Sequence, residues 1–363
     1  MSKIRPIAIY LPQFHPIPEN DEWWGKGFTE WKNVVNAKPL FKGHNQPHLP
    51  SDLGFYDLRL IETMQAQAEI AKEYGLTGFC YYHYWFNGKR LLNTPLDNML
   101  QHNKPDFPYM LCWANENWTR RWDGRENEVL IKQEYSNEDH YKHATFLCQS
   151  FFKDERYIKV GNKPVFVIYK ASLIPDLRNA LEIWNKTVSS FGFNGLYLLC
   201  MDNFIGNPAE DYGFEGAIHF HPDFRYFNRV KPSFAARFLK KTGLKESVLF
   251  RHHVEDYKSY YKAIENQRKL ISKKVFPGIT PMWDNTARVQ RNGIIFKNSS
   301  PLLYFEAITK ALNKFEPFSS DENFFFINAW NEWAEGNHLE PCQKYGHDYL
   351  KMTKKAIDLR NNI

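Results

Sequence analysis

The stretch "FFFINAWNEWAEGNHLEP" (residues 324–341) joins a strand-like apolar run to a polar cluster, and its first seven residues complete the pattern that decides the fold. They form the last of eight short apolar runs. The other seven are IRPIAIYLP (4–12), TGFCYYHYWF (77–86), PYMLCWAN (108–115), KPVFVIYK (163–170), GLYLLCM (195–201), GAIHFH (216–221) and GITPMWD (278–284). These runs are apolar nearly throughout instead of alternating, which is typical of buried parallel strands.

Stretches with helical spacing of apolar residues separate the runs. They cover 56–75, 136–152, 176–192, 255–270, 300–315 and 345–362. Alternating strands and helices predict βαβ units, and eight strands predict a closed (β/α)8 barrel, the TIM barrel. An open doubly wound sheet is the alternative. No G-x-G-x-x-G or Walker sequence follows the early strands, which counts against it.

The length of 363 residues fits a single barrel domain spanning residues 1–363. Two segments read as insertions into elaborated βα loops, near 13–55 and 222–252. Within the second, residues 225–245 are basic and aromatic. Three interpretations of this segment are open. It could be a solvated surface loop, it could steer an acidic glycan, or it could contact anionic lipid headgroups.

Composition narrows the class of protein. A net charge of +6 is far below what nucleic-acid binding requires, and no nucleic-acid partner is predicted. Aromatic residues make up 17% of the chain, which suits sugar stacking as well as an aromatic core. The five cysteines include no C-x-x-C pair, so neither zinc nor a disulfide framework is expected. The N-terminus lacks a signal-peptide pattern and no apolar run reaches 18 residues, which predicts a cytoplasmic protein without a membrane span.

Polar and aromatic residues gather at the ends of the predicted strands, where barrels of this type carry their chemistry. The candidate substrate-binding residues are Tyr10, Glu30, Trp31, Tyr82, His83, Trp85, Asn115, Glu116, Trp118, His219, His221, Trp283, Asp284, Trp330, Asn331 and Trp333. His219 and His221 have strand spacing and so face one side. With Asp202 or Asp284 they could hold a metal, but no metal-binding motif accompanies them, and sugar binding or structural hydrogen bonding is preferred. Neither a metal nor a cofactor is predicted.

Glu332 and Glu335 are the candidate catalytic residues. Cleavage of a glycosidic bond typically uses two carboxyl groups whose pKa values are pushed apart, and the flanking Trp330 and Trp333 would raise the pKa of an acid by desolvation. Gly336 would permit a tight turn beside them. The i, i+3 spacing fits both retaining and inverting geometries. The structural alternative is that both glutamates cap or decorate the loop before the last helix.

Several long motifs resemble the WbsX-like family, whose members are similar to glycoside hydrolase family 99 and are found among bacterial surface-polysaccharide genes. They are IAIYLPQFHPIPENDEWWGKGFTEW, FCYYHYWFNG, LCWANENWTRRWDG, PMWDNTAR and NAWNEWAEGNHLEP. The resemblance implies a (β/α)8 barrel that acts on glycosidic linkages without a nucleotide cofactor. It also implies that Glu332 is a base acting on a sugar 2-hydroxyl and that Glu335 is the general acid/base.

Three functions remain open on this basis. The first is a glycoside hydrolase or transglycosylase acting on a bacterial surface polysaccharide, retaining through neighbouring-group participation. The second is a glycosyltransferase of O-antigen or capsule (lipopolysaccharide) biosynthesis, and the third is a catalytically inactive carbohydrate-binding barrel. In each case the expected partner is an oligo- or polysaccharide, with acidic and lipid-linked glycans among the candidates.

Overall fold

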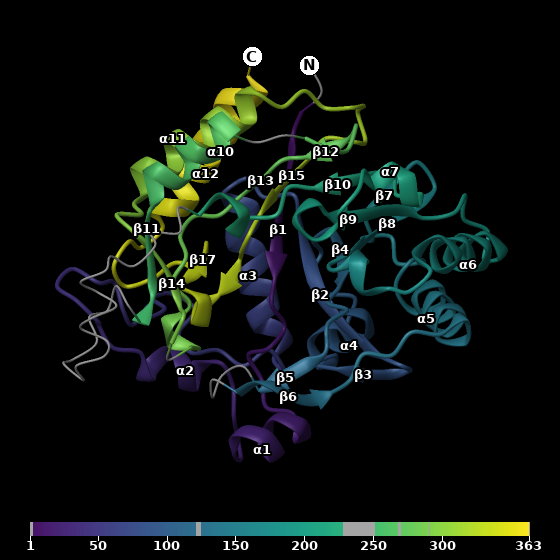
Figure 1. Cartoon of the computed structure of the whole chain (residues 1–363), viewed down its shortest axis with the longest axis horizontal. Helices are drawn as coiled ribbons and strands as arrows, with labels where there is room; N and C mark the ends of the chain where they lie inside the picture. Colours follow the sequence, from purple (N-terminus) through teal and green to yellow (C-terminus); the bar gives the residue numbers. More distant parts are fainter. Residues whose placement is uncertain (1–2, 121–124, 228–250, 268–269, 290, 363) are drawn as a thin grey trace, which may run out of the picture.

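The computed structural model describes residues 3–120, 125–227, 251–267, 270–289 and 291–362. Its centre is a parallel barrel sheet in which each strand pairs with the next in the order β1–β2–β4–β8–β9–β10–β12/β13–β15, and β15 returns to β1 (Figure 1). The strands are β1 (Arg5–Tyr10), β2 (Gly78–Phe86), β4 (Tyr109–Trp113), β8 (Lys163–Ile168), β9 (Tyr197–Met201), β10 (Gly216–Ile218), β12 (Val275–Phe276), β13 (Gly278–Ile279) and β15 (Phe324–Ile327). The predicted (β/α)8 barrel is therefore confirmed.

The seventh barrel position is divided at Pro277. β12 pairs with β10 through Ala217 and Val275, whereas β13 pairs with β15 through Gly278 and Phe326. Proline has no N–H to donate, so the ladder cannot run unbroken through it. The Pro277 carbonyl still accepts a hydrogen bond of 2.9 Å from Phe326 N, which keeps the barrel closed across the division.

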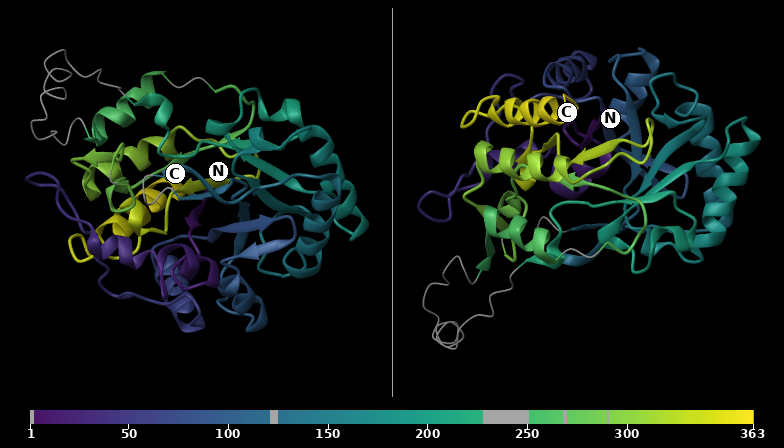
Figure 2. Two further views of the ribbon diagram at one scale, coloured as in Figure 1. Left: turned by 60° about the horizontal axis from the view of Figure 1, so that its bottom comes forward. Right: turned by 90° about the horizontal axis from the view of Figure 1, so that it is seen from above.

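Helices cover the outside of the barrel (Figures 1 and 2). They are α3 (Ile61–Glu73), α4 (Thr94–Gln101), α5 (Asn137–Ser150), α6 (Leu177–Ser190), α7 (Ala209–Tyr212), α10 (Tyr257–Gln267), α11 (Pro301–Asn313) and α12 (Asp348–Asn361). Ser136 and Ser300 fix the starts of α5 and α11, because each hydroxyl accepts a hydrogen bond from the backbone N–H three residues on. The predicted stretches match six of these helices, and the short α4 and α7 were not predicted.

The loops that follow the strands carry further structure. The first insertion forms α1 (Pro18–Trp24) and α2 (Trp31–Asn36), and the loop after β15 forms β16 (Asn331–Glu332), the 3₁₀ turn η6 (Trp333–Glu335) and β17 (Asn337–His338). The other additions are β3 (Lys89–Leu91), β5 (Trp118–Arg120), β6 (Arg125–Ile131), β7 (Lys159–Val160), β11 (His253–Asp256), β14 (Ile294–Lys297), η2 (Ala171–Leu173), η3 (Asp202–Phe204), η4 (Phe224–Tyr226) and η5 (Asn285–Ala287).

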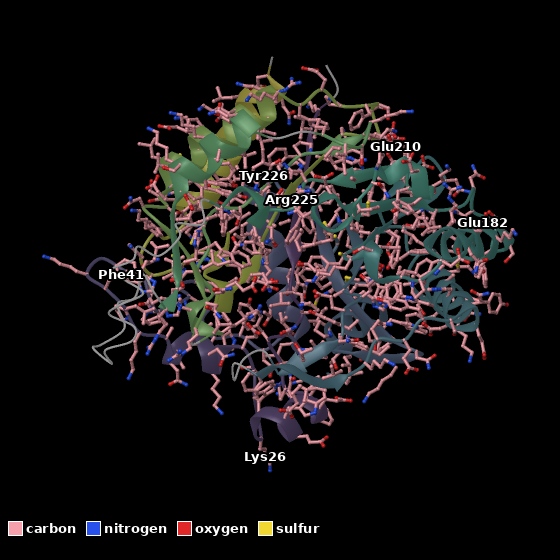
Figure 3. All side chains as sticks on the ribbon, in the orientation of Figure 1. Lys26, Phe41, Glu182, Glu210, Arg225 and Tyr226 are labelled. Atoms are coloured by element: carbon pink, nitrogen blue, oxygen red, sulfur yellow. The ribbon has the colours of Figure 1, made fainter. Side chains whose placement is uncertain are left out.

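Most of the second insertion, 222–252, lies outside the described residues, and so does most of the basic stretch 225–245. Arg225, labelled in Figure 3, is described; its guanidinium is paired with Asp223 at 2.7 Å and Asp202 at 3.0 Å. Its charge is therefore compensated by two carboxylates, although its side chain is 44% exposed.

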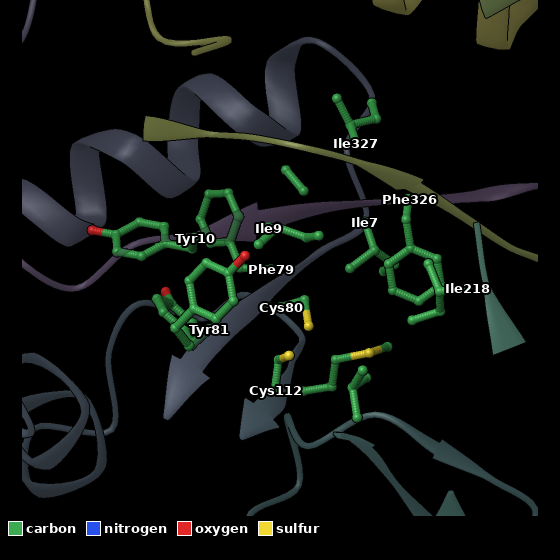
Figure 4. Packing of buried hydrophobic residues seen from close by; sticks show 14 of the residues in the cluster. Ile7, Ile9, Tyr10, Phe79, Cys80, Tyr81, Cys112, Ile218, Phe326 and Ile327 are labelled. Carbon is green, nitrogen blue, oxygen red and sulfur yellow. The ribbon is translucent and has the colours of Figure 1, made fainter. Parts of the chain in front are cut away.

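Aromatic and sulfur-containing side chains dominate the barrel core. Figure 4 shows Tyr10 beside Tyr81, with ring centroids 4.5 Å apart, and Cys80 near Cys112. All five cysteines are free and buried, which agrees with the expectation that they form no disulfide framework. The two termini lie side by side, and Ile4 N donates to Asn361 Oδ1 at 2.9 Å (Figures 1 and 2). No described helix is long and apolar enough to cross a bilayer.

Candidate active site

A cavity of about 310 Å³ opens at the carboxyl ends of the barrel strands. It is lined by residues from the carboxyl-terminal half of β2 and by residues that follow β1, β4, β8, β10, β13 and β15, so it lies where the chemistry of such barrels is found. The lining residues are Leu11, Gln13, Tyr82, Tyr84, Phe86, Ala114, Glu116, Asn117, Trp118, Thr119, Tyr169, Phe220, Phe224, Trp283, Asn285, Arg288, Glu332 and Glu335. Carboxylates and aromatic rings together suit a saccharide, whose hydroxyls need hydrogen bonds and whose C–H faces pack on rings.

Glu332 and Glu335 enter this cavity from the loop after β15. Glu332 ends β16 and Glu335 ends η6, so one tight turn carries both carboxylates. Gly336 follows with φ +53°, a left-handed conformation that favours glycine. The turn is fastened from the neighbouring loop, since Asp284 N donates to the Glu335 carbonyl at 2.7 Å.

Gly336→Ala should destabilise the protein by about 1–2 kcal/mol from the left-handed conformation alone. The new Cβ would also lie 2.9 Å from Asp284 Cβ and 3.0 Å from its carbonyl oxygen, so the turn must shift and displace Glu335. Denaturant unfolding measures the effect. Gly346→Ala is the matched control, because Gly346 has φ +50° but no atom within 4 Å of the added Cβ. Equal losses in the two variants would show that the close approach to Asp284 has no role.

Arg288 joins the two glutamates to a third carboxylate. Its Nη1 donates to Glu335 Oε1 at 2.6 Å, and its Nη2 donates to Glu332 Oε2 at 3.2 Å and to Glu30 Oε2 at 2.9 Å. Its Nε donates to the same Glu30 oxygen at 3.2 Å. One guanidinium therefore holds three carboxylates from two loops, Glu30 from the loop after β1 and the two other glutamates from the loop after β15.

The surroundings of Glu332 favour its protonated form. Burial raises the pKa of Glu332 well above its ordinary value, the nearby charge of Glu335 adds to this, and Arg288 opposes it. Glu335 is more open, with 20% of its side chain exposed against 6% for Glu332. The two carboxyl groups thus differ in environment, as an acid and base pair requires.

Asp284 supports the cluster from behind. Its Oδ2 accepts a hydrogen bond of 2.6 Å from His44 Nε2, and its Oδ1 accepts from the N–H and hydroxyl of Thr286, which fixes the turn that presents Arg288. Burial acts to raise the pKa of Asp284, but the contact with His44 outweighs it and the pKa is lowered. Asp284 therefore stays ionised and positions its neighbours.

A buried carboxyl group, Glu340, lies beneath the turn. It accepts hydrogen bonds from Trp333 Nε1 at 2.6 Å, Tyr56 OH at 2.8 Å and Gln67 Nε2 at 2.6 Å. The Trp333 ring stacks on His338 with centroids 3.7 Å apart. Trp333, one of the two residues between the candidate catalytic glutamates, is thus fixed on both its polar edge and its face.

The structure brings six of the predicted site residues to the cavity. They are Tyr82, Glu116, Trp118, Trp283, Glu332 and Glu335. Glu116 is paired with Lys170, whose Nζ lies 2.5 Å from its Oε1. Glu30 lies one contact further back, joined to the cavity through Arg288.

The other predicted residues are not among those that line the cavity. Tyr10 donates to Gln67, Trp31 donates to the Tyr56 carbonyl, and Trp85 donates to Asp139. Five more are hydrogen-bonded to other parts of the protein: His83 to His143, Asn115 to Tyr135 and Lys170, Asn331 to Leu11, Asp284 to His44, and Trp333 to Glu340. Trp330 is fully buried. These side chains hold the barrel and its loops together.

His219 and His221 face one side, as their spacing predicted, but they line a separate cavity of about 330 Å³ beside α10 and α11. His219 Nε2 lies 3.3 Å from Asp223 Oδ2, and His221 Nδ1 lies 2.8 Å from Tyr260 OH. Within the described ranges no group of three or more His, Cys, Asp or Glu side chains is arranged to hold a metal ion.

Several lining residues were not among the predicted site residues. They are Leu11, Gln13, Tyr84, Phe86, Ala114, Asn117, Thr119, Tyr169, Phe220, Phe224, Asn285 and Arg288. Strand alternation could have added Tyr84, because it lies two residues after Tyr82 and faces the same side. Arg288 closes the motif PMWDNTAR, but nothing in its spacing singles it out.

The barrel is similar along its whole length to structures of glycoside-hydrolase type. The endo-α-mannosidase of glycoside hydrolase family 99 from Bacteroides thetaiotaomicron superimposes with a TM-score of 0.59, covering 100% of this chain and 98% of that chain at 14% identity. A glycoside hydrolase-like protein superimposes with a TM-score of 0.62, covering 98% and 94% at 15% identity. The fold is therefore a (β/α)8 barrel of the kind that these hydrolases have.

Within that class, the chain belongs to the family described as glycosyltransferase WbsX, whose model matches residues 6–353. Two strains of Xanthomonas campestris pv. campestris carry relatives named WxcX, described as uncharacterized, that are 39% identical over 352 residues. The match covers 97% of this chain and 49% of theirs, so the chain spans about half the length of these relatives.

Proposed function

We propose that the protein acts on glycosidic bonds of an oligo- or polysaccharide of the bacterial surface, with Glu332 and Glu335 as its catalytic carboxylates. One observation carries the proposal: a single tight turn brings both glutamates into a cavity lined with aromatic rings at the carboxyl end of the barrel. The similarity to family 99 hydrolases supports the choice of bond, and the WbsX family supports a polysaccharide.

The proposed chemistry proceeds in two steps with retention. Ionised Glu332 takes the proton of the sugar 2-hydroxyl, the oxygen at C2 attacks C1, and Glu335 gives its proton to the departing glycosidic oxygen. Water then attacks C1, Glu335 takes the proton of that water, and the oxygen at C2 regains a proton from Glu332. The environment that raises the pKa of Glu332 makes its ionised form a stronger base, and this step requires the proton of the pair to lie on Glu335 when the saccharide is bound.

Glycosyl transfer is the second candidate, favoured by the description of the family itself. The two reactions share the carboxylate pair if transfer uses a sugar acceptor in place of water. They differ in the donor. The described residues in or beside the cavity include the four carboxylates Glu30, Glu116, Glu332 and Glu335 against the two cations Arg288 and Lys170, and this excess of acid opposes a diphosphate electrostatically.

Incubating the purified protein with the surface polysaccharide of its source organism should release shorter saccharides or new reducing ends without added nucleotide. Parallel reactions receive nucleotide-sugars alone and nucleotide-sugars with the polysaccharide. Mass spectrometry and reducing-end analysis identify the products. Strict dependence on a nucleotide-sugar would refute hydrolysis and favour transfer.

A further inference from the structure

The cluster around Arg288 contains more acid than base. Glu30, Glu332 and Glu335 all bond one guanidinium, so full ionisation would leave the four groups with a net charge of −2. Glu30 is 1% exposed, Glu332 6% and Arg288 15%, so water screens this charge poorly. An uncompensated buried charge is expensive, and uptake of a proton is the usual way to remove it.

Glu30 is built into the cluster at its most buried point. Both Nε and Nη2 of Arg288 donate to its Oε2, while its Oε1 is buried and receives no hydrogen bond from any described residue. A carboxylate with a bare buried oxygen pays the full cost of desolvation while ionised. Glu30 therefore holds Arg288 in place and, while ionised, adds a third negative charge to the cluster.

We propose that Glu30 and Arg288 are positioning residues that hold Glu332 and Glu335 together and keep one exchangeable proton within the cluster. One proton among three carboxylates and one guanidinium leaves a net charge of −1. The catalytic pair then has access to both a protonated and an ionised carboxyl group, which a two-carboxylate mechanism requires. The inference rests on the proposed function only in calling the pair catalytic.

Among the residues that the structure describes, the other carboxylates and phenols near the cluster are paired with a cation or histidine, or are neutral. Burial raises the pKa values of the phenols of Tyr82, Tyr84 and Tyr169 far above neutrality. Glu116 has its own cation in Lys170, and Asp284 has His44. The uncompensated negative charge is therefore concentrated in the Arg288 cluster.

The test compares the pH dependence of thermal stability in Glu30→Gln, Arg288→Met and the wild type. The pKa of Glu332 is raised in the folded protein. Its contribution to the free energy of unfolding is therefore full below the pKa of the unfolded chain and is lost as pH rises through the pKa of the folded protein. Glu30→Gln removes a like charge and should lower the pKa of Glu332 in the folded protein. Between pH 5 and 8.5 the Tm of this variant should therefore drop by about 2 °C or more less than the Tm of the wild type. Removing the positive charge of Arg288 should enlarge the fall by a similar amount.

Glu116→Gln is the control, because it removes a cavity carboxylate that pairs with a different cation, Lys170. This variant should keep the wild-type pH dependence of Tm. Arg288→Lys keeps the positive charge and should also keep it, and this variant tests the role of Arg288 if Arg288→Met does not fold. Equal or parallel changes in Glu30→Gln and Arg288→Met would overturn the inference. So would a pH dependence of Arg288→Lys unlike that of the wild type. None of these readouts uses turnover, so failure of the proposed function leaves the test intact.

Discussion

Glu332→Gln and Glu335→Gln should each lower turnover of the polysaccharide by about 10²-fold or more, the scale of general acid–base catalysis. Glutamine keeps the shape of the side chain and its hydrogen bond from Arg288, but it neither takes up nor releases a proton near neutral pH. Saccharide binding should persist, because the aromatic lining is untouched. Initial rates of reducing-end release and equilibrium binding of the same saccharide measure the two effects.

Stability separates loss of chemistry from loss of fold in these variants. The environment of Glu332 favours a neutral group, so Glu332→Gln should be at least as stable as the wild type at neutral pH. Tyr197→Phe removes a buried phenol that donates to Glu322 outside the cavity and should keep wild-type turnover. Wild-type rates in either glutamine variant would exclude that glutamate from the mechanism.

Glu340 should give the protein a second large pH dependence. Burial raises its pKa from 4.5 to about 7 despite its three hydrogen-bond donors. The folded state therefore holds this proton more tightly than the unfolded chain does. The stabilisation is full below pH 4.5 and is lost as pH rises through about 7. The gap between the two values corresponds to about 3 kcal/mol.

Denaturant unfolding of the wild type and Glu340→Gln at several pH values between 4.5 and 9 isolates this contribution. The difference between the two unfolding free energies should change by about 3 kcal/mol across the interval, because glutamine does not titrate. Glu69→Gln, on the exposed face of α3, should show no comparable change. A constant difference between the wild type and Glu340→Gln would mean that Glu340 keeps one protonation state throughout.

The barrel was predictable because buried parallel strands leave a strong signal. Each of the eight apolar runs contains a strand of the barrel, from Arg5–Tyr10 to Phe324–Ile327. The seventh was seen only in part, since Pro277 divides it and the predicted run began at residue 278. α7, with four residues, is too short to show a helical period.

The candidate site was predictable only by region. Strand ends were identified, but neighbouring strand residues face opposite sides. Tyr82 and Tyr84 line the cavity, whereas His83 packs outward against His143 and Trp85 stacks on the same ring. A strand-end cluster therefore mixes site residues with core residues, and the pattern of residue types alone does not separate them.

Long-range contacts explain the remaining differences. Glu30 and Arg288 are 258 residues apart in the sequence, and no local pattern pairs them. Glu340 was not among the predicted site residues, but partners from Tyr56 and Gln67 make it a buried support of the turn that carries Glu332 and Glu335. Such partnerships depend on barrel closure, which brings distant loops to one end.

The pairing of β1 with β15 has a consequence for biosynthesis. The first strand leaves the ribosome long before Phe324–Ile327, one of the two segments with which it pairs, and His44 and Tyr56 likewise emerge long before their partners Asp284 and Glu340. Since domains are synthesised from the N-terminus, the edge of β1 that faces β15 must remain unpaired until residue 324 has emerged. Nascent chains stalled before residue 324 should therefore expose β1 to proteases and chaperones, and release should protect it.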